Sequence, residues 1–253
     1  MAAADLTPDT AVPKAEHLAA IELARDAGDL LMELRSRSPR SGRTLSDEGD
    51  RLSHELLATE LAARFPHDAV RSEEGAEMAG ADRLWIIDPL DGSREFGEGR
   101  DDWAVHVALA IDGDPVVGAV GLPALQVVLG TSAPPALSDP APVPRLVVSR
   151  SRPPAVAQAL ADRLGATTVA MGSAGAKIAA VIRGQADIYI HAGGQYEWDS
   201  AAPVAVALAT GLHASRIDGS PLRYGLPDPW LPDLLVCHPT LADAALSALS
   251  EFG

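Results

Sequence analysis

The chain has 253 residues, of which 47% are hydrophobic, a composition typical of a globular protein with a large buried core. Its formal net charge of -15 at pH 7 argues against a basic surface for polymeric nucleic acid, because such binding depends on clustered lysines and arginines. A small anionic substrate is not excluded, since bound divalent cations reverse the local charge of an acidic site.

The spacing of apolar residues predicts two N-terminal helices followed by strands. The second helix carries an amphipathic run that ends before Pro66. Residues 131–144 contain five prolines, which is typical of a surface connection. Strands then alternate with helices, which indicates a second α/β lobe. We expect helices at 15–32 and 49–64, strands at 103–111 and 115–120 around a turn at 112–114, strands at 145–149, 168–170 and 186–190, and helices at 154–164 and 173–182.

These elements predict one compact unit over residues 1–253, with lobes at 14–130 and 145–253. Residues 1–8 lack the basic and apolar regions of a secretory signal, so we expect a loose arm there. Cys237 is the only cysteine, which excludes an intramolecular disulfide and favours a reducing compartment. The longest apolar stretch, 201–209, is too short to cross a bilayer. We therefore expect a cytoplasmic protein without membrane contact.

The most informative segment begins with the apolar residues 85–87 and ends in carboxylates. Pro89 has no backbone donor, so we expect the strand to stop and the chain to turn there. Asp88 and Asp91 would then converge around the Leu90 carbonyl, giving the all-oxygen environment that Mg²⁺ prefers. The same residue types are also the commonest in solvated turns, so this segment alone leaves both interpretations open.

The next two residues suit an anion. Gly92 allows a ligand to approach the backbone closely, and Ser93 would cap a helix whose N–H groups face that anion. Two further acidic clusters, Glu73-Glu74 and Glu197-Trp198-Asp199, also lie at predicted element ends. A metal site shared between distant segments requires acids at such junctions.

Taken in order, Glu73-Glu74, Asp88-Pro89-Leu90-Asp91-Gly92-Ser93 and Trp198-Asp199-Ser200-Ala201-Ala202 resemble the lithium-sensitive, magnesium-dependent phosphatase superfamily that includes inositol monophosphatase. The resemblance spans roughly residues 14–240. It implies an α/β (α+β) fold, a layered α-β-α-β-α sandwich. It also implies an acid before the helix that leads to Glu73, for which Asp50 is preferred over Asp47 and Glu48.

The resemblance further implies two or three Mg²⁺ ions. One would be held by Glu73, Asp88 and the Leu90 carbonyl, and another by Asp88, Asp91 and Asp199. Glu73 and Ser93, with Asp50 behind it, would orient and deprotonate an attacking water. Ser93 stands where most relatives carry Thr. The implied substrate-binding residues are Leu90, Asp91, Gly92, Ser93, Ser173, Lys177 and Asp199.

Substrate choice depends on weaker signals. Arg94-Glu95-Phe96 and the stretch Ser173 to Lys177 resemble the nucleotide-hydrolysing branch. We therefore expect removal of the 3′-phosphate from 3′-phosphoadenosine 5′-phosphate, a by-product of sulfate activation. Aromatic residues form only 4% of the chain, so few rings are available to stack an adenine. The alternatives are an inositol monophosphatase or fructose-1,6-bisphosphatase of broad specificity, and a non-catalytic metal- or nucleotide-binding sensor. A homodimer is left open.

Other signals favour structural roles. Residues 172–177 lack the spacing of a Walker loop, and a simple helix cap explains them as well. The seven histidines show no metal-ligand spacing, so we expect surface or hydrogen-bonded core positions. Asp101-Asp102 could be a fourth pair of metal ligands, but a solvated loop is the preferred interpretation. Cys237 is interpreted as a buried structural thiol.

Overall fold

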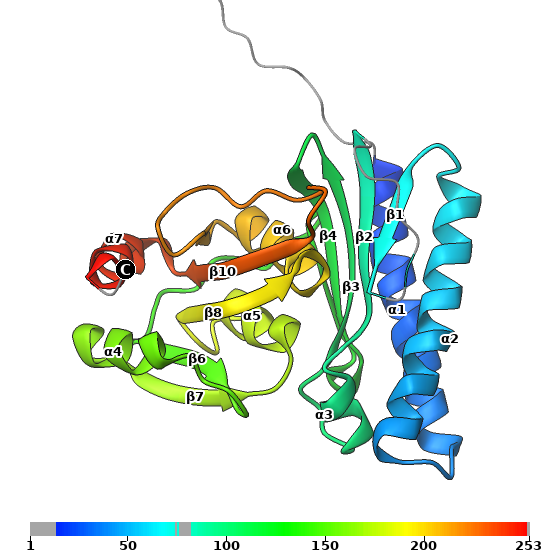
Figure 1. Ribbon diagram of the computed structural model, residues 1–253, viewed down its shortest axis with the longest axis horizontal. Helices are drawn as coiled ribbons and strands as arrows, with labels where there is room; N and C mark the ends of the chain where they lie inside the picture. Colours follow the sequence, from blue (N-terminus) through cyan, green and yellow to red (C-terminus); the bar gives the residue numbers. More distant parts are fainter. Residues whose placement is uncertain (1–13, 74, 76–81, 252–253) are drawn as a thin grey trace, which may run out of the picture.

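The computed structural model describes residues 14–73, 75 and 82–251. Its elements stack in five layers, α-β-α-β-α, as the resemblance implied (Figure 1). The outer layer on one side consists of α1 (Lys14–Arg37) and α2 (Gly42–Arg64), and the outer layer on the other side of α4 (Ala155–Leu164) and α7 (Pro239–Ser250). Between the two sheets lie α5 (Ala174–Ile182) and α6 (Ala201–Thr210).

The first sheet has the order β1-β2-β3-β4-β5. Its β1 is parallel to β2, and the remaining neighbours are antiparallel. The short helices α3 (Ser93–Gly97) and η1 (Pro123–Leu125) connect its strands. The strands are β1 (Ala69–Ser72), β2 (Arg83–Asp91), β3 (Ala104–Ile111), β4 (Asp114–Leu122) and β5 (Val127–Gly130).

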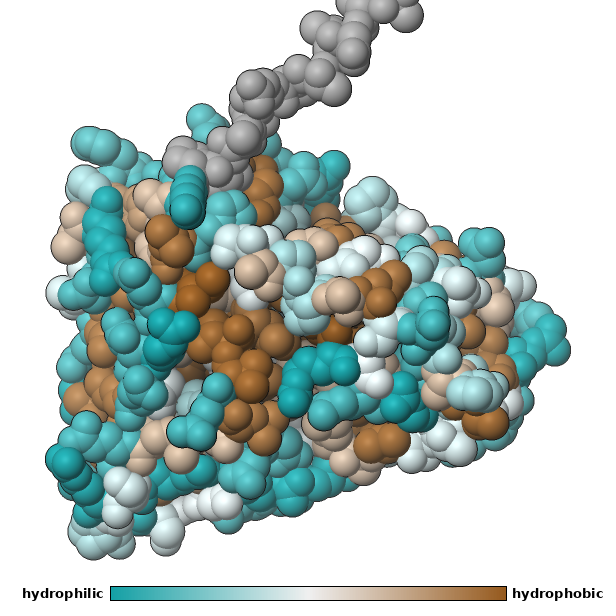
Figure 2. Space-filling view, turned by 180° about the vertical axis from the view of Figure 1, so that it is seen from behind, coloured by the Kyte–Doolittle hydropathy of each residue, from teal (hydrophilic) through white to brown (hydrophobic). Residues whose placement is uncertain are grey.

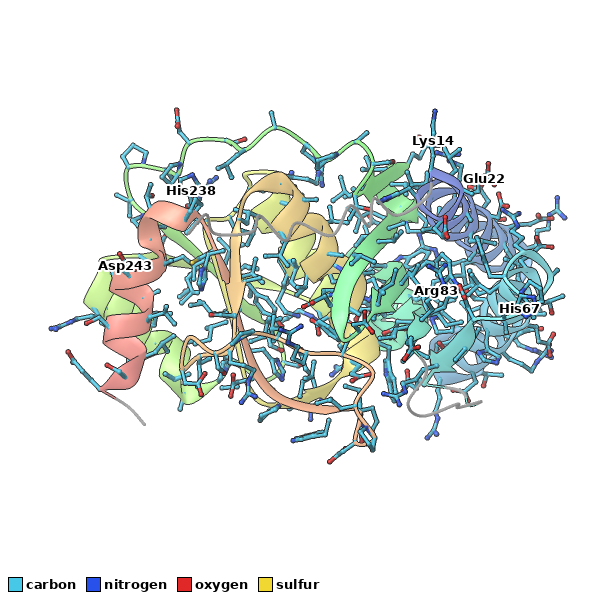
Figure 3. All side chains as sticks on the ribbon, turned by 90° about the horizontal axis from the view of Figure 1, so that it is seen from above. Lys14, Glu22, His67, Arg83, His238 and Asp243 are labelled. Atoms are coloured by element: carbon cyan, nitrogen blue, oxygen red, sulfur yellow. The ribbon has the colours of Figure 1, made fainter. Side chains whose placement is uncertain are left out.

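The continuous apolar run of β2 reflects a sheet that is covered on both faces. Trp85 and Ile87 pack with the residues of α1 and α2, while Leu84 and Ile86 face the cluster that contains α5 and α6. Alternate strand residues point to opposite faces, so both sets have to be apolar. Arg83, labelled in Figure 3, joins the start of β2 to α1 by an ion pair with Glu16 (2.9 Å).

The strand does not stop at Pro89, contrary to the expectation. β2 continues to Asp91, which pairs with Ala104 of β3, and the register shifts between Asp88 and Asp91. A bulge absorbs the missing donor of the proline, so that pairing resumes beyond it. The bulge turns Asp88, Leu90 and Asp91 out of the regular alternation at the end of the strand.

The second sheet is mixed, with the order β7-β6-β8-β10-β9. β6 is parallel to both β7 and β8, whereas β10 is antiparallel to β8 and β9. The helical turn η2 (Glu197–Asp199) follows β8 directly. The strands are β6 (Arg145–Ser149), β7 (Thr167–Met171), β8 (Ile188–Tyr196), β9 (His213–Ser215) and β10 (Trp230–Cys237).

Most expected elements are present, with some different ends. α1 is longer than predicted, and α2 begins at Gly42 because Leu45 and Ser46 already contribute a buried face. β8 extends beyond the expected residue 190 to Tyr196, since its pairing with β10 continues to that point. The expected arm at 1–8 and the acid Glu74 lie outside the described residues.

Cys237 is fully buried, and burial raises the pKa of its thiol to about 12. Within the described part of the chain, no helix combines the length and the apolar character needed to cross a bilayer.

On the face seen from behind, apolar side chains gather between the layer of α1 and α2 and the part of the molecule that contains the second sheet (Figure 2). The division into lobes and the homodimer both stay predictions.

Candidate functional site

Three aspartates from two distant parts of the chain converge between the sheets. Asp88 and Asp91 lie on the bulged end of β2, and Asp199 ends η2. Each can place one carboxylate oxygen within 4.8 Å of the others. The structure thus brings together the three aspartates that the motifs predicted as metal ligands.

The electrostatics show how unfavourable this cluster is without cations. Burial raises the pKa of Asp88 well above its ordinary value, and the charges of Asp91, Asp199, Glu73 and Asp50 raise it further. Burial, followed by the charge of Asp91, raises the pKa of Asp199 to about 7. Five carboxylates therefore act on one another, and a divalent cation would relieve their repulsion.

Asp91 is held by the start of α5. Its carboxylate accepts hydrogen bonds from the backbone N–H groups of Ala174 (3.1 Å) and Gly175 (2.5 Å). These N–H groups form the positive end of the helix dipole, which attracts an anionic group. Ser173 caps the same helix by accepting from the Ala176 N–H (2.8 Å). The helix-cap interpretation of residues 172–177 is therefore confirmed.

His106 connects two of the candidate ligands, which the sequence did not predict. It is fully buried on the face of β3 that faces α5, and its Nδ1 donates to the Trp198 carbonyl (2.9 Å). Its Nε2 lies 3.4 Å from Asp91 Oδ2. A Cβ on Gly175 would come within 1.9 Å of that nitrogen, so only glycine fits there. His106 thus links the Asp91 segment to the residue before Asp199.

One face of α2 supports the cluster from the other side. Positions 50, 53 and 54 share a helix face, and the charge of Asp50 acts on Asp88. Ser53 donates to the Pro89 carbonyl (2.8 Å) and fixes the bulge. His54 bonds to the Ser72 hydroxyl (3.0 Å), next to Glu73.

The competing acids near Asp50 have other partners. Asp47 lies 3.7 Å from Arg43 and its side chain is 66% exposed, and Glu48 pairs with Arg40 (2.5 Å). Asp50 lies inside α2 and not before it, contrary to the expectation, because the helix already begins at Gly42. Its predicted role in catalysis stays a prediction.

A buried ion pair joins the segment of Glu73 to that of Asp199. Arg71 donates to Glu197 (2.6 Å), and the two side chains are 3% and 0% exposed. Burial raises the pKa of Glu197, and the hydrogen bond from Arg71 opposes that effect. The pair joins β1 to η2 directly and so helps to set the relative position of the two acidic segments.

The Gly-Ser pair forms a tight turn. Gly92 has φ +89°, and a Cβ there would lie 2.8 Å from the Cβ of Ser173, so the close packing requires glycine. Gly92, and not Ser93, is the N-cap residue of α3, which corrects the expected cap. The Ser93 hydroxyl donates to the Leu90 carbonyl (3.2 Å).

We expected Lys177 to contact the substrate, but its amine is bonded to backbone carbonyls. It is 5% exposed, its amine donates to the carbonyls of Gly172 and Ser173, and burial lowers its pKa. Ser173 is also buried, beside Gly92. Their roles in substrate binding stay predictions.

A cavity of about 580 Å³ opens beside the cluster, with Asp199 and Lys177 on its wall. Aromatic rings also line this cavity, although aromatic residues form only 4% of the chain. The other lining residues that matter here are Arg152, Tyr189, His191, Tyr196 and Trp230. A sequence signal for part of this wall was available, because Tyr196 lies only three positions before Asp199.

The remaining motif residues have structural roles around the site. Arg94 pairs with Glu98 (2.8 Å), Glu95 with Arg150 (2.7 Å), and Phe96 is buried in the core. Asp102 accepts from Arg100 (2.7 Å) and from the Gly172 N–H (2.6 Å). These contacts give Asp102 a structural role, as expected, although the residue is paired and not solvated.

Comparisons with known proteins agree with this geometry. The inositol monophosphatase family matches residues 14–251. The sequence is 50% identical over 240 residues to the 3′-phosphoadenosine 5′-phosphate phosphatase of Mycobacterium bovis, covering 89% of this chain and 90% of that protein. It is 32% identical over 228 residues to the 3′(2′),5′-bisphosphate nucleotidase CysQ of Escherichia coli, covering 80% and 91%. The crystal structure of CysQ from Bacteroides thetaiotaomicron is similar with a TM-score of 0.77 and 27% identity, over 90% of this chain and 98% of that one.

Proposed function

The chain belongs to the inositol monophosphatase family, and on that premise we propose that it removes the 3′-phosphate of 3′-phosphoadenosine 5′-phosphate, giving AMP and phosphate. The observation that carries the substrate is the 50% identity, over nearly the whole chain, to a protein named for this activity. The cavity with aromatic walls beside the acidic cluster supports a nucleotide substrate. We place the enzyme in the cytoplasm, in sulfur assimilation.

The donor set fits Mg²⁺. The three clustered aspartates offer only oxygen ligands, and burial together with mutual repulsion raises the pKa values of Asp88 and Asp199, an effect that bound cations would oppose. We assign Glu73, Asp88 and the Leu90 carbonyl to one ion, and Asp88, Asp91 and Asp199 to another, with two or three ions in all. Bound divalent cations would polarise the phosphate and promote attack by water.

The protein groups orient the reactants. Glu73 and the Ser93 hydroxyl, with Asp50 behind it, hold the attacking water, and the Gly92 and Ser93 N–H groups bind phosphate oxygens. Ser93 acts without forming a covalent intermediate, because no described histidine is hydrogen-bonded to its hydroxyl. The hydroxyl instead donates to the Leu90 carbonyl, which ties it to the bulge.

The remaining substrate contacts lie on the cavity side. Leu90, Asp91 and Asp199 border the phosphate, and Ser173 and Lys177 complete the substrate-binding set. Lys177 supplies a positive charge beside the cavity although its amine is bonded to backbone carbonyls. This charge favours a second phosphate on the substrate.

Phosphate release from three substrates tests the proposal. We expect kcat/KM for 3′-phosphoadenosine 5′-phosphate to exceed that for inositol 1-phosphate and fructose 1,6-bisphosphate, and activity to vanish when Mg²⁺ is chelated. A preference for inositol 1-phosphate would transfer the protein to the inositol-phosphate branch. Absence of turnover on all three with Mg²⁺ would indicate a binding protein.

A further inference from the structure

Two large aromatic residues at the cavity are unusually exposed. Tyr196 and Trp230 are each 43% exposed, and both line the cavity that Asp199 borders. Such rings are normally buried, because they carry more apolar surface to remove from water than most side chains do. Rings kept at the wall of a cavity are available to a ligand.

The two rings form a corner that the strands hold in place. Trp230 lies directly opposite Tyr196 in the pairing of β10 with β8. Their ring centroids are 5.5 Å apart at an interplanar angle of 79°, and Tyr196 also stacks on Trp198 (4.7 Å, 10°). The Tyr196 N–H donates to Asp199 Oδ2 (2.7 Å), which fixes the corner relative to the candidate metal ligand.

The position of Trp230 depends on a glycine. A Cβ on Gly194 would lie 1.6–2.6 Å from three atoms of the indole, so the ring rests against the bare backbone of β8. The Gly194 carbonyl accepts from His191 Nε2 (2.7 Å), which holds this backbone in place. Any side chain at position 194 would have to displace the indole.

We infer that Trp230 and Tyr196 form the subsite of the cavity that binds the base of a nucleotide. Gly194 determines the specificity for nucleotides, because its lack of a side chain leaves room for the indole of Trp230. The inference rests on the proposed function, to which it adds the recognition of the purine. A planar heteroaromatic base packs well on such rings, whereas a polyol such as inositol has no π face to offer. A cavity of about 580 Å³ also lies within the size range of small-molecule sites.

The first experiment compares two neighbouring glycines. Gly193 and Gly194 both have positive φ, +109° and +91°, so an alanine strains the backbone at either position. Only at position 194 does the new Cβ meet the indole, since nothing lies within 4 Å of a Cβ at 193. We expect Gly194→Ala to raise KM for 3′-phosphoadenosine 5′-phosphate about tenfold above Gly193→Ala. Equal effects of the two variants would refute the role of Gly194.

The second experiment isolates the base by direct binding. AMP and ribose 5-phosphate share the sugar and the 5′-phosphate, and only AMP carries the purine. By isothermal titration with Mg²⁺ present, Trp230→Leu should raise the Kd of AMP about tenfold and that of ribose 5-phosphate by less than about twofold. A wild-type protein that binds both ligands equally, or a variant that weakens both equally, would overturn the subsite. Thermal unfolding establishes that each variant is folded.

These outcomes separate the inference from the proposed function. If wild-type protein releases no phosphate from 3′-phosphoadenosine 5′-phosphate, the proposed function fails, and the comparison of AMP with ribose 5-phosphate still decides the subsite. If turnover is efficient but Trp230→Leu does not discriminate between the two ligands, only the subsite fails.

Discussion

Replacing Asp199 by asparagine should change how the stability of the metal-free protein depends on pH. Burial and the charge of Asp91 raise the pKa of Asp199 from 3.8 to about 7 in the folded protein. Between these two values the folded protein keeps a proton that the unfolded chain has released. The free energy of unfolding therefore falls as the pH rises through this window, because the folded state binds more protons.

The difference between the two pKa values sets the magnitude. At roughly 1.4 kcal/mol per pH unit, it corresponds to about 4 kcal/mol between pH 4 and pH 8. Asp199 is partly exposed and titrates together with its neighbours, so we expect a loss of about 2–4 kcal/mol. Asparagine removes the charge but keeps an oxygen that can accept from the Tyr196 N–H.

Urea unfolding in the presence of EDTA, at several pH values from 4.5 to 8, measures this effect. Relative to Asp199→Asn, the wild type should lose about 2–4 kcal/mol of unfolding free energy across the series. Asp26→Asn, an exposed aspartate on α1, is the control and should follow the wild-type profile. Saturating Mg²⁺ should stabilise the wild type most at pH 8, since metal binding competes with protonation.

Parallel profiles for wild type and Asp199→Asn in EDTA would refute this reasoning. They would mean that neither burial nor the charge of Asp91 disfavours the ionised Asp199 carboxylate in the folded protein.

Three further results are expected. Asp91→Asn should keep the fold and lower phosphatase activity at least about 100-fold, because it removes a ligand charge and places an amide against the N–H groups of α5; near-normal turnover of a folded variant would contradict the assignment. Glu197→Gln should lower the free energy of unfolding by about 3 kcal/mol or more in urea titrations, since Arg71 loses its buried counter-charge; a loss below about 1 kcal/mol would exclude a positioning role for the pair. Li⁺ should inhibit at submillimolar to millimolar concentration by replacing one divalent ion without its full charge, and equal inhibition by K⁺ at matched ionic strength would speak against this.

Local signals predicted much of the fold. The continuous apolar run before Asp88 indicated a strand buried on both faces, which β2 is. The strand at residues 145–149 was predicted with its observed ends, because it combines β-branched residues with turn residues on both sides. The end of β8 was missed because Gly193 and Gly194 signal a turn locally, whereas pairing with β10 keeps the strand extended.

The candidate ligands were predictable because each carboxylate lies in a motif of contiguous residues. Their supports were not, since each depends on partners that are distant in sequence. His106 looks like an isolated polar residue in an apolar strand, and only the fold places it against Asp91 and the Trp198 carbonyl. Trp230 likewise becomes part of the cavity only through its pairing with β8.

The buried pair of Arg71 and Glu197 joins residues that are 126 positions apart, and this separation bears on how the protein is made. During synthesis, β2 leaves the ribosome with its two aspartates long before η2 does. α6 follows η2, so the face of the first sheet that α6 later covers is still open to water at that stage, and its apolar side chains are exposed to other chains. Closing so long a loop is slow. A nascent chain that stops before residue 199 therefore presents an apolar sheet face and an incomplete acidic cluster, and exposed apolar surface of this kind favours aggregation.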